Sequence, residues 1–283
     1  MIRFDDLHRS ISKKIYVPVI GDIMATRWAY EALSVEQFKS NRYQAPFFKY
    51  EMDISQNDWY ASFLLPTLKV KVNECLAVGK DPEYHEYVEN NFYKINYHIE
   101  DIAKISGVEP GKWKDQINPQ EFTEFVADQT KLYLDSVRTT FRMKSRSISL
   151  MRDSLYNQQL SKIGEEEFLK MKSEYYNENL ANFVLNRLTT SKIYDSNDRL
   201  IQKADPVFMP PSSKTGRAHF FAPFKQIGDI KIGTLLFNVL VIWIMIITLF
   251  FTLYYNLLKR FIGSLESMNL PILRKFGRDF LQF

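Results

Sequence analysis

The stretch that decides the fold is residues 232–258, IGTLLFNVLVIWIMIITLFFTLYYNLL, which contains no Asp, Glu, Lys, Arg or His. A helix needs about 20 mainly apolar residues to cross the hydrocarbon of a bilayer. A buried core helix is usually shorter and keeps a polar stripe, whereas apolar residues cover every face of this segment. The stretch therefore predicts a transmembrane helix over 232–258 that holds the rest of the chain at a membrane.

The residues before this stretch have the composition of a globular domain. The chain has 283 residues, 25% of them charged, and those before position 232 are rich in Tyr and Phe. A segment of this length can bury an ordinary core. The net charge of +4 is small and dispersed, so we expect no nucleic-acid partner. Cys75 is the one cysteine, which excludes an intrachain disulfide.

The residues at the C-terminal end of the span predict a membrane interface. Tyr254 and Tyr255 are followed closely by Lys259 and Arg260, an aromatic-then-basic pattern typical of membrane anchors. Basic residues near the two ends of the span differ little in number, so the positive-inside rule favours a cytoplasmic C-terminus only narrowly. Those after the span are Lys259, Arg260, Arg274, Lys275 and Arg278, and those before it are Lys214, Arg217, Lys225 and Lys231.

The N-terminal residues do not resemble a signal peptide, because Asp5 and Asp6 stand where an apolar segment is needed. Two arrangements are then open. Either the C-terminal helix is a late anchor and the large domain is cytoplasmic, or earlier membrane helices of a longer protein deliver the domain to the other side.

The domain before the span is predicted to be mainly α-helical. Turn residues and caps divide it into segments. Gly164 separates the two longest helices, which we expect to fold back as a long helical hairpin. We expect helices over 24–40 (with Asp22 as N-cap), 58–78 (interrupted by Pro66), 82–105 (after Asp81), 118–162 (capped by Asn118) and 165–188, a loop over 41–57, and irregular segments over 1–23 and 189–231.

Motifs that carry catalysis or bind phosphate are missing from the sequence. It contains no G-x-x-x-x-G-K-[ST], H-E-x-x-H, C-x-x-C or G-x-S-x-G. His85 and Glu89 are four residues apart, a spacing that suits a metal but is more typical of a solvated helix face. We expect no catalytic, cofactor or metal site in this chain.

Two residues inside the span stand out from the aliphatic background. Asn238 is the most polar, and it either forms an interhelical hydrogen bond, contacts a substrate, or lies at the interface near the outer end of the helix. Trp243 is interpreted as a helix-packing residue. Thr234, Thr248 and Thr252 are expected to bond back to their own helix.

Residues 24–38, MATRWAYEALSVEQF, resemble the segment that follows the fifth transmembrane helix in White-family (G-subfamily) ABC transporter permeases. The family's Asn-Glu step is replaced here by Glu36-Gln37. Residues 219–225, HFFAPFK, with the LLFNVLVIW that follows, resemble the C-terminal end of large fused ATPase–permease transporters of Bacteroidetes-type bacteria. The central residues, about 45–215, resemble no family. The matching positions in the first segment are Arg27, Trp28, Ala29, Tyr30, Glu31, Ala32, Leu33 and Phe38.

The resemblance implies that the chain is the C-terminal part of the permease of an ATP-driven exporter in the bacterial cytoplasmic (inner) membrane. Residues 1–23 would follow a missing transmembrane helix, 24–231 would form a helical extracytoplasmic domain, 232–258 the last transmembrane helix, and 259–283 a basic cytoplasmic tail. The implied partners are membrane lipid, the missing permease helices and an ABC ATPase domain, in a dimeric assembly. ATP and Mg would bind that ATPase, and this chain would not transport alone.

The resemblance also implies roles for individual residues. Arg27, Trp28, Glu31 and Phe38 would lie on a helix at the outer end of the translocation path, with Asn238 and Trp243 on the span. The Arg27–Glu31 pair would orient that helix and Trp28 would pack on neighbouring helices, although such a pair is equally typical of ordinary helix stabilisation.

Two other hypotheses compete with the exporter. A single-pass, tail-anchored protein would carry a cytoplasmic helical domain whose helices over 118–162 and 165–188 bind a partner protein as a coiled coil. A membrane-bound enzyme is the third, and no motif supports it. The side of the membrane on which the large domain lies separates the first two.

Overall fold

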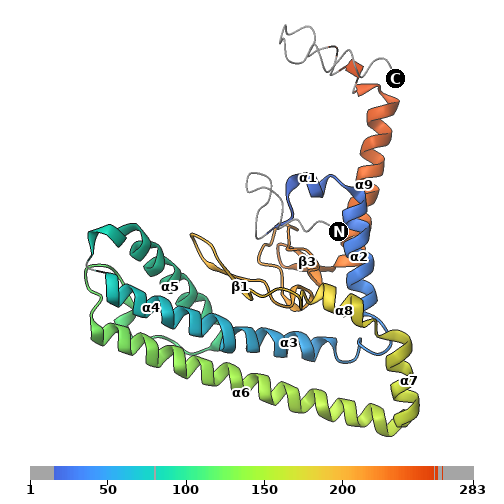
Figure 1. The fold of residues 1–283 in the computed structure, drawn as a ribbon. Helices are drawn as coiled ribbons and strands as arrows, with labels where there is room; N and C mark the ends of the chain where they lie inside the picture. Colours follow the sequence, from blue (N-terminus) through green and yellow to red (C-terminus); the bar gives the residue numbers. More distant parts are fainter. Residues whose placement is uncertain (1–15, 80, 258, 261–262, 264–283) are drawn as a thin grey trace.

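The computed structural model describes residues 16–79, 81–257, 259, 260 and 263, and it is mainly helical. A long helical arm makes up most of the domain before the span (Figure 1). In this arm, α3 (Phe48–Trp59), a π-helical turn (Tyr60–Leu64) and α4 (Leu65–Val78) form one rod. A 3-10 turn (Pro82–Tyr84) leads into α5 (His85–Ser106), which packs back against α4.

The arm is completed by α6 (Glu124–Ile163), which follows a 3-10 turn (Lys112–Gln116). Its 40 residues extend for about 60 Å and run back along α4 and α3 (Figure 1). Side chains from α4, α5 and α6 meet in one apolar core, in which Leu68, Ile95 and Leu134 are fully buried. Burial of this shared core stabilises the arm, because each helix alone would expose its apolar face.

The long hairpin is built from other helices than the sequence predicts. The partner of α6 is the α3–α4 rod, whereas α7 (Glu165–Tyr175) and α8 (Glu178–Val184) are separate short helices that follow the turn at Gly164. The predicted loop over 41–57 is therefore wrong in its second half, where α3 begins at Phe48. Local signals at Asn41 and Pro46 indicate a turn, but only contact with α6 shows that the following residues are a helix.

Three predicted helix boundaries also need correction. Pro66 does not interrupt its helix, because the π-helical turn before it shifts the hydrogen bonds of the backbone where proline has no N–H. Asn118 caps only a turn, accepting hydrogen bonds from the backbone N–H of residues 120 and 121, and the N-cap of α6 is Thr123. Asp22 does not cap α2, which starts after Met24.

The segments predicted to be irregular contain short regular elements. Residues Val19–Asp22 form a one-turn helix, α1. Two antiparallel hairpins lie within 189–233: β1 (Ile193–Asp195) with β2 (Leu200–Gln202), and β3 (Phe224–Ile227) with β4 (Ile230–Gly233). A short 3-10 turn (Pro206–Phe208) lies between them. The dipeptide Gly228-Asp229 is a sequence signal for the second hairpin, because the first position of such a turn favours glycine. In the structure Gly228 has the positive φ, 59°, that this turn requires.

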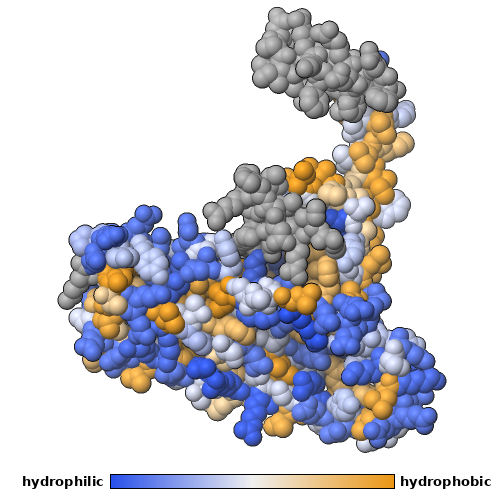
Figure 2. Space-filling view, viewed as in Figure 1, coloured by the Kyte–Doolittle hydropathy of each residue, from blue (hydrophilic) through white to orange (hydrophobic). Residues whose placement is uncertain are grey.

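Although Ile232 and Gly233 belong to β4, the apolar helix predicted over 232–258 is confirmed in its central part as α9 (Thr234–Tyr254). Its 21 residues cover about 32 Å, which is long enough to cross a bilayer, and most of its surface is exposed. Figure 2 shows hydrophobic residues gathered along α9, whereas the visible face of the arm is mostly hydrophilic. Beyond α9, Lys259 and Arg260 are exposed, and most of the basic tail expected over 259–283 lies outside the described residues.

Helix α2 (Ala25–Lys39) connects the arm to α9. It lies side by side with the first half of α9 and runs in the opposite direction (Figure 1). At its other end, Phe38 packs against Phe48 of α3 and Phe208 in a second apolar core, with ring centroids 6.4 and 5.9 Å away. The position of the arm relative to α9 is therefore set by what holds α2 at its two ends.

Candidate functional site

A buried carboxylate, Glu31, lies at the centre of the junction between α2 and α9. Its side chain has no exposed surface. One carboxylate oxygen accepts hydrogen bonds from Lys225 Nζ at 2.7 Å and from the backbone N–H of Phe221 at 3.1 Å. The other accepts a hydrogen bond from Asn238 Nδ2 at 3.0 Å. One side chain thus joins α2 to α9, to strand β3 and to the loop before β3.

Arg27 forms the second cationic contact of Glu31. It lies one helical turn earlier in α2, with Nη1 3.5 Å from the carboxylate of Glu31 and Nη2 3.6 Å from that of Asp22. Its guanidinium also stacks over the ring of Trp28, 3.9 Å from the centroid. The side chain is only 6% exposed, and its Nε and Nη1 atoms have no hydrogen-bond acceptor within the described structure. Arg27 is therefore held by charge and by aromatic stacking.

Asn238 attaches α9 to this cluster. Its amide nitrogen donates hydrogen bonds to the backbone carbonyl of Trp28, at 3.0 Å, and to Glu31. The rings of Trp28 and Phe237 lie 6.3 Å apart beside it. Asn238 is fully buried and bonds to α2, which supports the interpretation as an interhelical hydrogen bond. It lies in the second turn of α9, so its predicted place near the end of the helix stays a prediction with respect to the membrane interface.

The loop before β3 has an unusual backbone where it meets Glu31. Phe221 has a φ of 68°, a conformation that costs energy in a bulky residue. In this conformation its backbone N–H donates to Glu31. The next residue, Ala222, accepts a hydrogen bond at its carbonyl from the hydroxyl of Thr234, at the start of α9. The loop before β3 is thus bonded to α2 through Phe221 and to α9 through Ala222.

The buried charges of the junction do not cancel, because two cations face one carboxylate. Arg27 and Lys225 are two buried cations beside the single buried carboxylate of Glu31, and Asp22 is a more exposed second acid near Arg27. Burial lowers the pKa of Lys225, and the nearby charge of Glu31 acts against this shift. Burial likewise lowers the pKa of Arg27, against the same carboxylate. Glu31 is therefore the group that makes burial of both cations tolerable.

The structure brings together four of the predicted residues and separates the others. Arg27, Trp28, Glu31 and Asn238 meet at the junction. Phe38 is a core residue at the far end of α2, and Trp243 is 59% exposed on α9, so neither belongs to this site. The anchor residues Tyr254, Tyr255, Lys259 and Arg260 are exposed at and beyond the end of α9.

Lys225 is the residue that sequence reasoning missed. It was counted among the basic residues flanking the span, but it is 1% exposed and pairs with Glu31, so it does not act as a surface charge. Its setting in the aromatic stretch 219–225 was the available signal, because a lone cation among aromatic residues indicates burial with a partner. Thr234 was also misread, since its hydroxyl bonds to Ala222 and not to its own helix, whereas Thr248 and Thr252 bond back as predicted.

Other candidate chemistry is not assembled in the described part of the chain. His85 Nδ1 and Glu89 lie 4.0 Å apart and both side chains are at least 70% exposed, as expected of a solvated helix face. Among the described residues, no group of three His, Cys, Asp or Glu side chains is placed to hold a metal ion. The junction itself is a fixed polar contact between elements distant in sequence.

Three comparisons with known proteins found no match to this chain, whether by family models, curated proteins or solved structures. The similarity of residues 24–38 to ABC permeases therefore stays a prediction, as do the expected partners, cofactors and location.

Proposed function

We propose that this chain is the C-terminal part of the permease of an ATP-driven ABC exporter, with α9 as its last membrane helix and the helical arm outside the cytoplasm. The observation that carries the proposal is the buried junction of Arg27, Glu31, Lys225 and Asn238. It couples the helix that resembles a permease segment to the first turns of the span. Any movement of α9 in a transport cycle would be passed to the arm through this contact.

The exposed surface of α9 supports the proposal. Among its exposed side chains, Leu236, Ile244 and Leu249 are each about 60% exposed, and such a surface needs lipid or other helices around it. The short helix α1 adds to it, because Val19 and Ile20 are more than 60% exposed next to the end of α2 that lies against α9. Further permease helices packed on α9 would cover these side chains.

The proposed topology can be tested with single cysteines. The native Cys75 is 2% exposed and burial raises the pKa of its thiol to about 12, so it is a silent background for maleimide. We expect Glu166→Cys in α7 to react with a membrane-impermeant maleimide in intact spheroplasts. We expect Gly263→Cys to react only after permeabilisation. Labelling of Glu166→Cys only after permeabilisation would refute an extracytoplasmic arm.

The exporter part of the proposal needs a separate readout. The tagged chain should be isolated from its native membrane in mild detergent and incubated with a photoreactive ATP analogue and vanadate. We expect a polypeptide of the isolated assembly, or an upstream part of the same chain, to trap the nucleotide. Glu31→Ala should reduce vanadate-dependent trapping if the junction couples the arm to the transport cycle. An assembly without any nucleotide-trapping polypeptide would refute the exporter.

A second candidate function, partner binding by a tail-anchored protein, is favoured by one observation on α6. Phe125, Leu132, Met143 and Leu150 are each more than 60% exposed. Successive residues of this set are seven, eleven and seven positions apart, which is close to two, three and two helical turns, so all four lie on one stripe of α6. An exposed apolar stripe of this kind suits a helix of another protein. If the chain is a tail-anchored protein with a cytoplasmic domain, we expect Gly263→Cys to react with the membrane-impermeant maleimide in intact spheroplasts, and Glu166→Cys not to react.

A further inference from the structure

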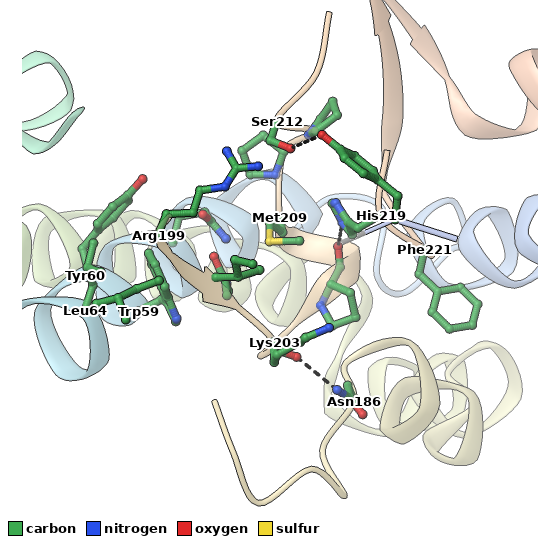
Figure 3. A pocket seen from close by; sticks show the side chains of 18 of the residues that line it. Trp59, Tyr60, Leu64, Asn186, Arg199, Lys203, Met209, Ser212, His219 and Phe221 are labelled. Carbon is green, nitrogen blue, oxygen red and sulfur yellow. Dashed lines mark hydrogen bonds between the residues drawn. The ribbon is translucent and has the colours of Figure 1, made fainter. Parts of the chain in front are cut away.

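A cavity of about 580 Å³ lies between the arm and the segment that carries the strands, and Phe221 connects it to the junction. In Figure 3, Trp59, Tyr60 and Leu64 form one side of it, His219 and Phe221 lie on the opposite side, and Met209 lies between them. Residues of α5, including His98 and Asp101, also line it. This volume falls in the range of sites that bind small molecules, and the mixed polar and apolar lining is typical of them.

Buried nitrogen atoms without acceptors are the feature that points to a ligand. Trp59 Nε1, His98 Nδ1, Gln56 Nε2 and Arg199 Nε belong to residues that line this cavity, and none has a hydrogen-bond partner in the described structure. Trp59 is 6% and His98 4% exposed, so bulk water does not satisfy them. Buried donors in native proteins are nearly always paired, so four around one cavity need an explanation.

The unpartnered ring nitrogen of His98, Nδ1, is a hydrogen-bond donor. Its Nε2 accepts a hydrogen bond from the backbone N–H of Leu200, at 2.9 Å, so this nitrogen carries no proton. Burial lowers the pKa of His98 to about 4, and the ring is neutral at physiological pH. The single ring proton is therefore on Nδ1. The four unpartnered atoms are all N–H groups, and they require an acceptor.

The charges around the cavity favour an acceptor with one negative charge. Arg199 lines it with an Nε that has no hydrogen-bond partner in the described structure, together with the carboxylate of Asp101, whose pKa is raised by burial. Arg199 Nε lies 3.6 Å from the carboxylate of Asp198, so Arg199 is partly compensated already. His219, on the opposite side, donates Nε2–H to the carbonyl of Pro206, and burial lowers its pKa to about 4. A doubly charged phosphate would lack compensating charge in such a site.

We propose that this cavity binds a carboxylic acid with an apolar body. Its carboxylate would accept hydrogen bonds from the N–H groups of Trp59, His98 and Gln56. Its apolar part would lie against Leu64 and Met209. The site does not depend on the exporter assignment, because the donors of the cavity lie in the arm and in the strand-bearing segment, outside α9.

The test uses the full chain in detergent and a series of fluorine-labelled phenylalkanoates, each paired with its uncharged amide. Binding is measured by fluorine NMR relaxation, with protein-free micelles as the blank. We expect at least one acid to saturate with a Kd below about 1 mM, and its amide to bind at least about fivefold more weakly. Saturation by none of the acids, or equal binding of acid and amide, overturns the proposal.

Two variants locate the binding, and their thermal unfolding is compared with the parent protein first. Trp59→Phe keeps an aromatic ring but loses the donor, and we expect about tenfold weaker binding of the acid. Trp113→Phe, outside the cavity, is the matched control and should leave binding unchanged. Gln56→Glu should weaken the acid about tenfold or more and its amide much less. Equal effects of the two tryptophan variants, or equal effects of Gln56→Glu on acid and amide, overturn the proposal.

Discussion

Neutralising Glu31 is the sharpest test of the junction. Glu31→Gln keeps the size of the side chain but removes its charge, and it leaves Arg27 and Lys225 as two buried cations without a carboxylate between them. Breaking a buried ion pair by removing one partner costs about 3–5 kcal/mol. For a domain of this size, about 2–4 °C is lost for each kcal/mol. We therefore expect the unfolding midpoint to fall by roughly 6–20 °C.

The measurement is thermal unfolding of the full chain in detergent, followed by tryptophan fluorescence. Trp28 lies beside the junction and reports on it. The matched control is Glu36→Gln, because Glu36 lies on the same helix outside the network, and we expect a shift of at most about 2 °C. An equal fall of the unfolding midpoint in Glu31→Gln and Glu36→Gln would refute the argument that Glu31 holds the junction together.

The charge count also predicts an order among variants. Lys225→Met leaves Glu31 with Arg27, Asn238 and the N–H of Phe221, so we expect it to cost less than Glu31→Gln. The double variant Glu31→Gln with Lys225→Met again contains a single buried cation, and we expect it to be more stable than Glu31→Gln alone. A Lys225→Met variant less stable than Glu31→Gln would contradict the electrostatic account.

Three further predictions concern other parts of the domain. Gly216 has a φ of +82°, and a Cβ there would lie 3.2 Å from Phe237, so Gly216→Ala should cost about 1–3 kcal/mol. Gly233→Ala, where a Cβ meets nothing within 4 Å, should cost less than about 1 kcal/mol, and equal unfolding midpoints for the two variants would count against this reading. The thiol of Cys75, with its pKa raised to about 12, should react with maleimide at pH 7.5 only after the domain is unfolded in urea; fast labelling of the folded protein would contradict its burial. Burial lowers the pKa of His219 from 6.5 to about 4, so the unfolded state takes up its proton first as the pH falls below 6.5; the contribution of His219 to stability is complete above that value and should fall by about 2 kcal/mol between pH 8 and 5, in addition to that of His98. His219→Gln should remove that part of the pH dependence, and an unchanged pH profile would show that His219 does not cause it.

The features that the sequence determined are those that depend on neighbouring residues. The uncharged stretch 232–258 predicted the apolar helix α9, because length and composition alone decide whether a helix can cross a bilayer. The helix over 24–40 was correct for the same reason, since helix propensity acts within a few residues. Asp81 was correctly identified as a capping residue, but it caps the 3-10 turn Pro82–Tyr84 and not α5, whose N-cap is Tyr84. The chance that Asn238 bonds to another helix was also visible, because an amide in an apolar helix needs a partner.

Only the tertiary structure decided which distant groups meet. Lys225 lies 194 residues from Glu31 in the chain, and no local pattern shows that the two share a buried ion pair. Helix α3 was read as a loop because its stability comes from packing along α6, a contact that propensity does not contain. The donors of Trp59 and His98 likewise became a candidate site only when folding placed α3 and α5 around one cavity. Burial and pairing depend on the whole fold, because the cost of a buried charge or donor is set by every group packed around it.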